Sequence, residues 1–222
     1  MTLPGVYVRF AAVAAAVLGA AASIAGGPAR TAAADPCPDV EIVFARGTSE
    51  PPGIGRVGQA LTDALQPQLG ARTLGTYGVD YPASYNFLAA AAGAADATAH
   101  IANMAAQCPG TRIVLGGYSQ GAAAVSMLAG VPPLGDRIGS IGSAPALPAA
   151  TARNVVAVAV FGNPAAKFGN PLSTSGLFAG RAIDVCGDGD PICSPGRNPS
   201  AHTGYETSPY IDQAVSFVAP LV

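Results

Sequence analysis

The sequence is poor in charge, in aromatic side chains and in histidine. Charged residues make up 11% of the 222 residues and aromatic residues 6%, and the chain has two histidines and no tryptophan. Lysine and arginine together number 11 against 13 acidic residues, so there is no basic patch of the kind that binds nucleic acid. Two histidines and four cysteines without a C-x-x-C spacing also disfavour a metal centre. The chemistry has to come from a few polar side chains.

The N-terminal segment has the pattern of a secretory signal peptide. Arg9 precedes an uncharged apolar run, Phe10–Gly27, and the small residues Thr31–Ala34 supply an A-x-A cleavage site. A membrane anchor is the alternative, which glycines and a proline at the end of the run disfavour. We therefore expect residues 1–34 to be a signal peptide and residues 35–222 to be a secreted domain.

The expected mature chain is long enough for one α/β domain with a sizeable core. Beyond the signal segment no second apolar stretch has membrane-spanning length. All four cysteines lie in this part, and an exported chain with an even number of cysteines is expected to form disulfides, for which three pairings exist. The short spacing between Cys186 and Cys193 favours a bridge between them, which leaves Cys37 with Cys108.

Apolar runs and helical patterns alternate along residues 35–222. Continuous apolar runs predict buried strands, whereas apolar residues spaced by four, as at Val57, Leu61 and Leu65, predict an amphipathic helix. Strands separated by helices indicate a mostly parallel sheet covered on both faces, with a ligand crevice at the carboxyl ends of its strands. The expected strands are Glu41–Arg46, Arg72–Val79, Ile113–Leu115 and Asn154–Phe161, and the expected helices are Val57–Gln66, Phe87–Gln107 and the segment after Ser119.

The segment Gly117-Tyr-Ser-Gln-Gly121 lies between one of these strands and an alanine-rich helix. It matches the nucleophile elbow, a strained turn that lifts a serine hydroxyl above the sheet. Strand and helix pass closely at such a turn, so the positions two before and two after the serine must be small, and Gly117 and Gly121 occupy them. Ser119 is a candidate nucleophile; the alternative is a turn that only links strand and helix.

A serine hydroxyl needs a base within hydrogen-bond reach and an acid that orients the base. His202 is the single histidine after Ser119 and is therefore the candidate base, although a histidine in a surface loop would look the same. His100 precedes the serine in an expected helix, where we expect a partly exposed residue without a catalytic function.

Four aspartates between Ser119 and His202 are candidates for the acid: Asp136, Asp184, Asp188 and Asp190. Asp188 and Asp190 lie between Cys186 and Cys193, where a disulfide would hold a carboxylate at fixed geometry. An acidic turn in solvent is the alternative, and a calcium loop is disfavoured because its ligand series is incomplete. Composition does not choose between Asp188 and Asp190.

In these motifs and their order, the chain resembles the cutinase family over nearly all of residues 35–222. Phe44–Glu50 is similar to the family's oxyanion loop and Gly117–Gly121 to its elbow, while Asp190–Cys193 and Ala201-His202 are similar to its acid and base segments. The alanine-rich composition most resembles the secreted cutinase-like proteins of actinobacteria, mycobacteria in particular.

The resemblance implies an α/β-hydrolase fold and a triad of Ser119, His202 and Asp190. Residues 35–222 are too few to add a large lid domain to the sheet, so we expect an open site. It implies an oxyanion hole formed by Thr48, through its side chain and N–H, and by the backbone N–H of Gln120. The pairing of Cys37 with Cys108 fits the family as well. No cofactor or metal is implied.

The function that these residues indicate is a secreted serine esterase that cleaves lipid or polyester bonds through an acyl-enzyme. We expect a monomer that makes transient contact with lipid or cell-wall surfaces, is free or associated with the cell wall, and binds no nucleic acid. One alternative is a phospholipase, lysophospholipase or acetyl-polysaccharide esterase that uses the same site. Another is a secreted binding or antigenic protein without catalysis.

Overall fold

Strands and helices alternate in the computed structural model, which describes residues 37–135, 142–207 and 209–222. Within these ranges five strands form one sheet in the order β2-β1-β3-β4-β5, and each neighbouring pair is parallel. The strands are β1 (Val40–Ala45), β2 (Leu74–Gly78), β3 (Arg112–Tyr118), β4 (Val155–Phe161) and β5 (Ala182–Val185). The predicted α/β fold with a parallel central sheet is confirmed, whereas the expected signal peptide lies outside the described residues.

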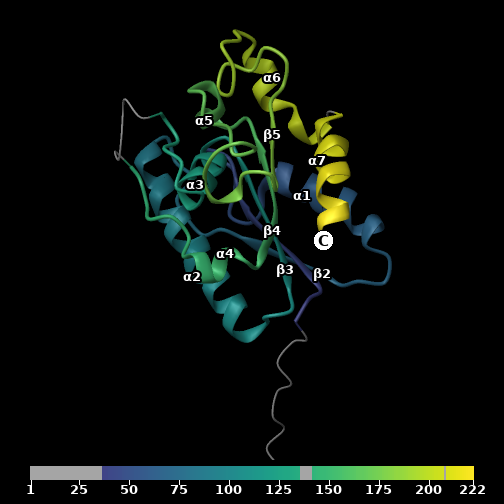
Figure 1. Ribbon diagram of the computed structural model, residues 1–222. Coiled ribbons are helices and arrows are strands. Elements are labelled where there is room, and N and C mark those ends of the chain that lie inside the picture. The colour runs from purple at the N-terminus through teal and green to yellow at the C-terminus, as the bar shows by residue number, and fades with distance from the viewer. Residues whose placement is uncertain (1–36, 136–141, 208) are drawn as a thin grey trace, which may run out of the picture. The chain divides into compact units, whose positions relative to one another are not determined.

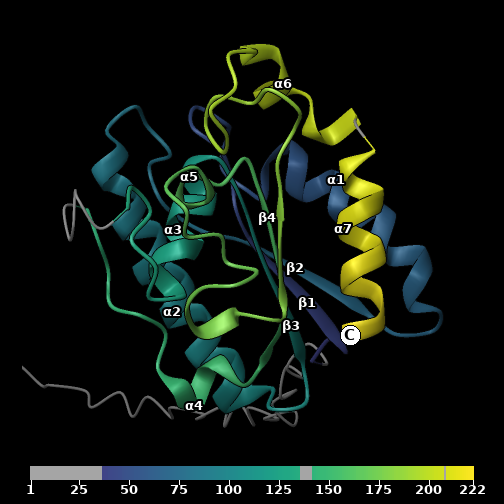
Figure 2. The same cartoon turned by 45° about the horizontal axis from the view of Figure 1, so that its top comes forward.

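Helices cover both faces of the sheet (Figures 1 and 2). On one face lie α1 (Gly55–Leu65) and α7 (Tyr210–Val218), and on the other lie α2 (Ala90–Gln107) and α3 (Gln120–Leu128). Alternate residues of β1 point to opposite faces, so Ile42 and Phe44 pack with α1 and α7, whereas Val43 packs with α2 and α3. The sheet is therefore buried on both sides, as its continuously apolar strands predict.

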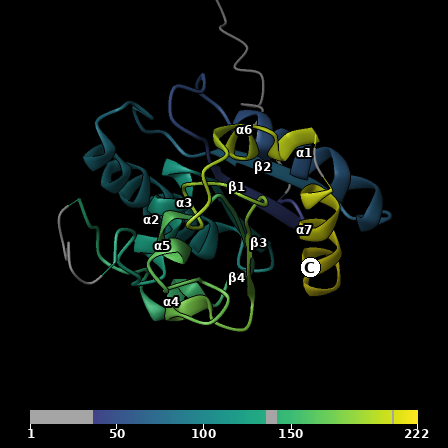
Figure 3. The same cartoon turned by 90° about the horizontal axis from the view of Figure 1, so that it is seen from above.

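The connections between the strands place a crevice between β1 and β3. The chain runs from β1 to β2 at one edge, then returns through α2 to β3 on the other side of β1. At such a reversal of strand order the loops that leave the two central strands diverge and open a crevice at their carboxyl ends. Figure 3 looks onto this end of the sheet, where α6 (Pro199–Thr203) lies.

The predicted elements agree with the structure within a few residues, with one conformational difference. The stripe Val57, Leu61 and Leu65 is buried in α1 as expected, and Pro67 lies in the 3-10 turn η1 (Gln66–Leu69) that follows this helix. The helix expected over Phe87–Gln107 begins as a 3-10 turn, η2 (Phe87–Ala89), and is α-helical only from Ala90.

Several short elements were not predicted. They are β5, α7, α4 (Ala149–Ala152), α5 (Pro164–Lys167), α6 and the 3-10 turns η3 (Gly176–Phe178), η4 (Tyr205–Thr207) and η5 (Ala219–Leu221). Most of them span three to five residues, too few for a period of 2 or 3.6 to emerge from the sequence. Their conformation depends on contacts with the sheet and its helices.

Two disulfides close loops of very different length. Cys37, just before β1, is bonded to Cys108, just after α2, across 71 residues. Cys186 and Cys193 are bonded across seven residues in the loop that follows β5. A longer closed loop removes more conformational entropy from the unfolded chain, so the two bridges should differ in their effect on stability.

We expect the variant Cys37→Ala/Cys108→Ala to lose more stability than Cys186→Ala/Cys193→Ala. Loop-closure entropy gives about 4 kcal/mol for the long loop and about 2.5 kcal/mol for the short one. Urea unfolding of both double variants beside the wild type measures the difference. Equal losses, or a larger loss for the short loop, would show that native-state contacts outweigh the entropy of the unfolded chain.

Candidate active site

Ser119 lies at the turn between β3 and α3 in a strained backbone conformation. Its φ is 54° and its ψ is −113°, a backbone conformation that residues other than glycine rarely adopt. The flanking glycines explain how the turn is possible. A Cβ on Gly117 would lie 2.6 Å from the backbone of Gly121, and a Cβ on Gly121 would overlap the backbone oxygen of Ala45 in β1. The requirement for small residues inferred from the sequence therefore has a structural cause.

The side chains of Ser119, His202 and Asp190 form a line of two hydrogen bonds. Nε2 of His202 lies 2.8 Å from Oγ of Ser119, and its Nδ1 lies 2.8 Å from Oδ2 of Asp190. An ionised carboxylate can only accept hydrogen bonds, so Nδ1 carries the proton in this arrangement and Nε2 is left to accept from the serine. Such an arrangement can take the proton from a serine hydroxyl as that oxygen attacks an electrophile.

Asp190, rather than Asp188, faces His202. The Asp190 side chain is fully buried, and its Oδ1 accepts from the N–H of Ile192 at 2.7 Å. Asp188 is exposed. Burial acts to raise the pKa of Asp190, but hydrogen bonds from His202, Tyr205 and Ile192 outweigh it and hold the pKa below its usual value. The carboxylate therefore stays ionised beside the imidazole at neutral pH.

The other candidates of the sequence lie elsewhere. The Asp184 carboxylate accepts from the side chain of Asn163 and from the N–H of Ser173, and so fixes the connection between β4 and β5. His100 projects from α2, where its Nε2 lies 2.9 Å from Glu41 and its ring stacks on Tyr77. Asp136 is outside the described residues.

Tyr205 is a site residue that the sequence analysis missed. Its hydroxyl donates to Oδ2 of Asp190 at 2.6 Å and accepts from the N–H of Gly187 at 2.8 Å, and its side chain is fully buried. Burial and the hydrogen bond to Asp190 both raise the pKa of Tyr205. The only signal in the sequence is a tyrosine three residues after His202, which becomes meaningful once Asp190 is known to be buried below it.

Thr48 and Gln120 approach each other at the crevice between β1 and β3. The Thr48 hydroxyl lies 3.3 Å from Oε1 of Gln120, and Gln120 is the first residue of α3. The first N–H groups of a helix have no partner within the helix and carry the positive end of its dipole. Both residues can therefore present donors to a negative oxygen near Ser119.

Arg46 holds the loop that carries Thr48. This buried arginine donates from Nε to the backbone oxygen of Glu50 at 2.9 Å and from Nη1 to that of Val79 at 3.1 Å. The Glu50 carboxylate accepts from the N–H of Gly47 at 2.5 Å. The loop after β1 is thus tied at both of its ends, which limits the movement of Thr48.

A second network, centred on Arg56 of α1, holds the segment around His202. The Arg56 guanidinium donates to the backbone oxygen of Thr203 and to Glu206, each at 2.6 Å, and to the Tyr118 hydroxyl at 3.1 Å. That hydroxyl donates to the backbone oxygen of His202 at 2.6 Å. Burial is the main cause that raises the pKa of Tyr118 to about 12, so the phenol stays a neutral donor.

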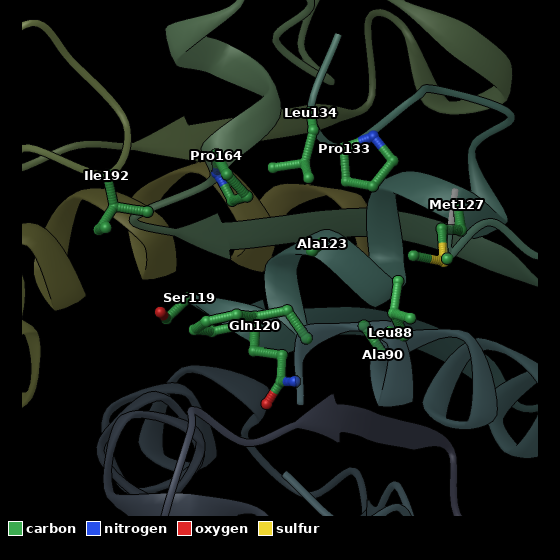
Figure 4. A pocket seen from close by; sticks show the side chains of 12 residues that line it. Leu88, Ala90, Ser119, Gln120, Ala123, Met127, Pro133, Leu134, Pro164 and Ile192 are labelled. Atoms are coloured by element: carbon green, nitrogen blue, oxygen red, sulfur yellow. The ribbon is translucent and has the colours of Figure 1, made fainter. Parts of the chain in front are cut away.

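An apolar cavity of about 260 Å³ opens beside Ser119 (Figure 4). It extends from the serine along α3 toward Met127, with Leu134 on one side and Leu88 on the other. Pro164, the first residue of α5, also lines it. An ester carbonyl placed at Ser119 would have this cavity within reach of one of its substituents.

Cys186, Asp190 and Cys193 are the one group in the described part of the chain with atoms close enough to share a metal ion. Both sulfurs are joined in a disulfide, so neither is a thiolate that could bind a metal. Along the described ranges, no helix combines the length and the apolar character needed to span a membrane.

Comparison with known proteins places these features among ester hydrolases. A family model described as Cutinase matches residues 36–222. The probable carboxylesterase Culp3 of Mycobacterium tuberculosis is 53% identical over 188 residues, which cover 83% of this chain and 70% of that protein. The phospholipase Culp4 of the same species is 48% identical over 82% of this chain and 78% of its own length. A Trichoderma reesei cutinase solved with a phosphonate inhibitor superposes with a TM-score of 0.68 at 38% identity, over 84% of this chain and 78% of that one.

We expect Gly121→Ala to destabilise the fold, because the new methyl group would overlap the backbone of β1. Overpacking of this kind costs about 1 to 3 kcal/mol or more. Gly110→Ala is the matched control, since nothing lies within 4 Å of a Cβ at that position, and its effect should stay below about 0.5 kcal/mol. Thermal and urea unfolding measure both, and equal stabilities of the two variants would contradict the close crossing.

We expect Tyr205→Phe to lower stability by about 1 to 3 kcal/mol at pH 6, because it removes a hydrogen bond to a buried carboxylate and leaves the N–H of Gly187 unpaired. Part of this loss should depend on pH. The low pKa of Asp190 stabilises the native state above the unfolded value of about 3.9, and this contribution disappears as pH falls through the folded pKa. The difference in free energy of unfolding between the wild type and Tyr205→Phe should therefore become smaller below about pH 4.

Tyr210→Phe is the control for this pH effect. The Tyr210 hydroxyl accepts from the N–H of Asp188 at 3.1 Å, so its loss costs a similar backbone hydrogen bond at a different carboxylate-bearing residue. Urea unfolding between pH 6 and pH 3 should show a stability difference between the wild type and Tyr210→Phe that does not change with pH. If the difference for Tyr205→Phe is also independent of pH, the coupling between Tyr205 and the ionised Asp190 is refuted.

Proposed function

The chain belongs to the cutinase family and is a carboxylic ester hydrolase, and we propose that it is a secreted serine esterase that cleaves lipid or polyester bonds at Ser119. The observation that carries the proposal is the pair of 2.8 Å contacts that link Ser119, His202 and Asp190. Ser119 is partly exposed, so a substrate can reach its hydroxyl.

In the acylation step, Oγ of Ser119 attacks the ester carbonyl while its proton passes to Nε2 of His202. Asp190 stabilises the imidazolium that forms, because its carboxylate is ionised and accepts from Nδ1. The imidazolium then gives the proton to the leaving alcohol. The acyl group remains on Ser119 as an ester.

Deacylation repeats these steps with water as the nucleophile. His202 takes a proton from the water as its oxygen attacks the acyl-enzyme, and Oγ of Ser119 regains a proton as it leaves. In both steps the carbonyl oxygen becomes negative. Donors at Thr48 and at the N–H of Gln120 stabilise that charge, and the Arg46 network and the helix α3 hold their backbone in place. The Thr48 hydroxyl donates to Oε1 of Gln120 in the structure and has only to rotate to reach the oxygen of the substrate.

The surface near the cavity supports a lipid or polyester substrate. Tyr85, Phe87 and Leu88 are 78%, 59% and 55% exposed, and Leu134 is 39% exposed. Phe87, Leu88 and Leu134 also line the cavity. Apolar side chains held in water at the entrance of a site favour transient contact with an apolar substrate surface.

Phospholipid is a second candidate substrate, because the similar Culp4 is named a phospholipase and phospholipids carry the same carboxylic ester bonds. An acetylated polysaccharide fits less well, since an acetyl group has a single carbon beyond its carbonyl and would use little of the apolar cavity. Secretion is supported by the two disulfides, which persist in oxidising compartments, and by the signal pattern of residues 1–34. A monomer, free or associated with the cell wall, remains the expected state.

We expect Ser119→Ala to reduce hydrolysis of para-nitrophenyl butyrate by about 10⁴-fold or more, because the variant has no nucleophile. Ser216→Ala is the control: this serine is exposed on α7, which packs on the face of the sheet opposite α3, and its loss should leave turnover unchanged.

A second readout identifies the attacking oxygen. A para-nitrophenyl phosphonate should phosphonylate Ser119 with release of para-nitrophenolate, which mass spectrometry of the labelled peptide detects. Hydrolysis that survives in Ser119→Ala, or a label on another residue, would refute the assignment. A wild-type protein with intact disulfides that neither hydrolyses nor takes the label would favour a non-catalytic binding protein.

A further inference from the structure

We infer, on the premise that the chain hydrolyses esters at Ser119, that the apolar cavity binds the acyl chain, holds about eight to ten carbons, and has its length set by Ala123 and Met127.

The lining matches an alkyl chain that ends in a polar group. Of the 12 described residues that line the cavity, Ser119 and Gln120 alone have polar side chains, and they are adjacent at the start of α3. The remaining lining residues are apolar, including Leu88, Met127 and Leu134. A sugar or a charged headgroup would lose its hydrogen bonds to water along most of this length, whereas an alkyl chain gains from leaving water.

Ser119, Ala123 and Met127 follow one another at intervals of four residues, and positions four apart lie on the same face of a helix. Figure 4 shows Ala123 between Ser119 and Met127 on α3, with Leu134 and Leu88 on either side of that row. The cavity therefore runs along the helix from the reacting serine to the methionine. Ala123 has the smallest of the three side chains, so it leaves the middle of this path open.

The position of His202 assigns the cavity to the acyl half of the ester. His202 has to reach the leaving oxygen to protonate it, so the alcohol half must lie on the His202 side of the carbonyl. Neither His202 nor Asp190 is among the described residues that line the cavity, although both belong to the same site. The acyl chain is the substituent that points away from His202, and it enters the cavity.

Two independent estimates give the chain length. Eight residues of helix from Ser119 to Met127 rise about 12 Å, and an extended chain advances about 1.2 Å per bond, which corresponds to about ten bonds. A cavity of 150 Å³ holds the six carbons of benzene, so the cavity of about 260 Å³ holds about ten carbons. The first estimate ends at Met127, and the volume agrees with it in the number of carbons.

The first test compares two isomers with the same atoms. Ethyl octanoate and octyl acetate have the same formula and similar hydrophobicity, but they carry the eight-carbon chain on opposite sides of the ester oxygen. We expect kcat/KM to be at least about tenfold higher for ethyl octanoate, because only its chain can enter the cavity. Equal values, or a preference for octyl acetate, would overturn the assignment of the acyl half.

The second test measures kcat/KM for para-nitrophenyl esters from acetate to palmitate. We expect a rise of about two- to fourfold per methylene up to C8–C10, and no further rise beyond. Ala123→Leu should move this limit to about C4 or C5, since Ala123 lies about 6 Å along the helix from Ser119. Met127→Ala should move it toward longer chains by about three carbons, the number of side-chain atoms removed beyond Cβ.

Met104→Ala is the matched control, because Met104 packs against the core from α2 and does not line the cavity. The ratio of variant to wild type is taken for each ester, so that the low solubility of long esters cancels. Ala123→Leu adds atoms toward a cavity and Met127→Ala removes them, so a folding defect would not shift the limit in opposite directions. Thermal melting of each variant verifies that it is folded.

The outcomes separate this inference from the proposed function. Shifts in opposite directions, with Met104→Ala unchanged, support the length limit set by Ala123 and Met127. Hydrolysis and phosphonate labelling at Ser119, without a limit or with a limit that neither variant moves, would overturn the inference and leave the esterase intact. No hydrolysis and no labelling of the wild type would overturn both.

Discussion

At the start of α3 the backbone passes so close to the end of β1 that no side chain fits between them. Gly121 meets this constraint against Ala45, and Gly117 meets it against Gly121 itself. The close approach allows Ser119 to adopt a φ of 54°, with its N–H bonded to the backbone oxygen of Phe161 in β4 at 2.9 Å. The strands β1, β3 and β4 therefore all contact the turn around Ser119, and the packing of the sheet stabilises its strained backbone conformation.

The buried carboxylate of Asp190 is the second constraint, because an ionised group without partners would be costly in this environment. His202, Tyr205 and the N–H of Ile192 supply its partners, and the disulfide between Cys186 and Cys193 closes the loop around it. The same bonds that keep the charge buried also orient the imidazole toward Ser119. Stability of this loop and the geometry of the site thus depend on the same hydrogen bonds.

The site is built from both layers of helices. On one face of the sheet α3 carries Gln120 and the wall of the cavity, while on the other face Arg56 of α1 binds the backbone beside His202. The serine lies between these layers at the end of β3, where the order of the strands reverses. Residues held by both layers therefore meet at the contact between Oγ of Ser119 and Nε2 of His202.

The sequence by itself determined the parallel α/β architecture, the elbow around Ser119 and the choice of His202, since continuous apolar runs, a G-x-S-x-G segment and a single later histidine are local facts of the chain. Resemblance was needed to prefer Asp190 to Asp188, because two aspartates separated by one glycine look alike in composition.

Only the tertiary structure decided that Asp190 is the buried partner of His202, that Tyr205 and Arg56 support these residues, and that α3 lines an apolar cavity. These features join segments far apart in the chain, such as α1 with the residues that follow α6, and no local pattern encodes a contact over that separation. Short elements such as β5 and α6 were missed for the same physical reason, because their conformation comes from the sheet and helices they pack against rather than from their own few residues.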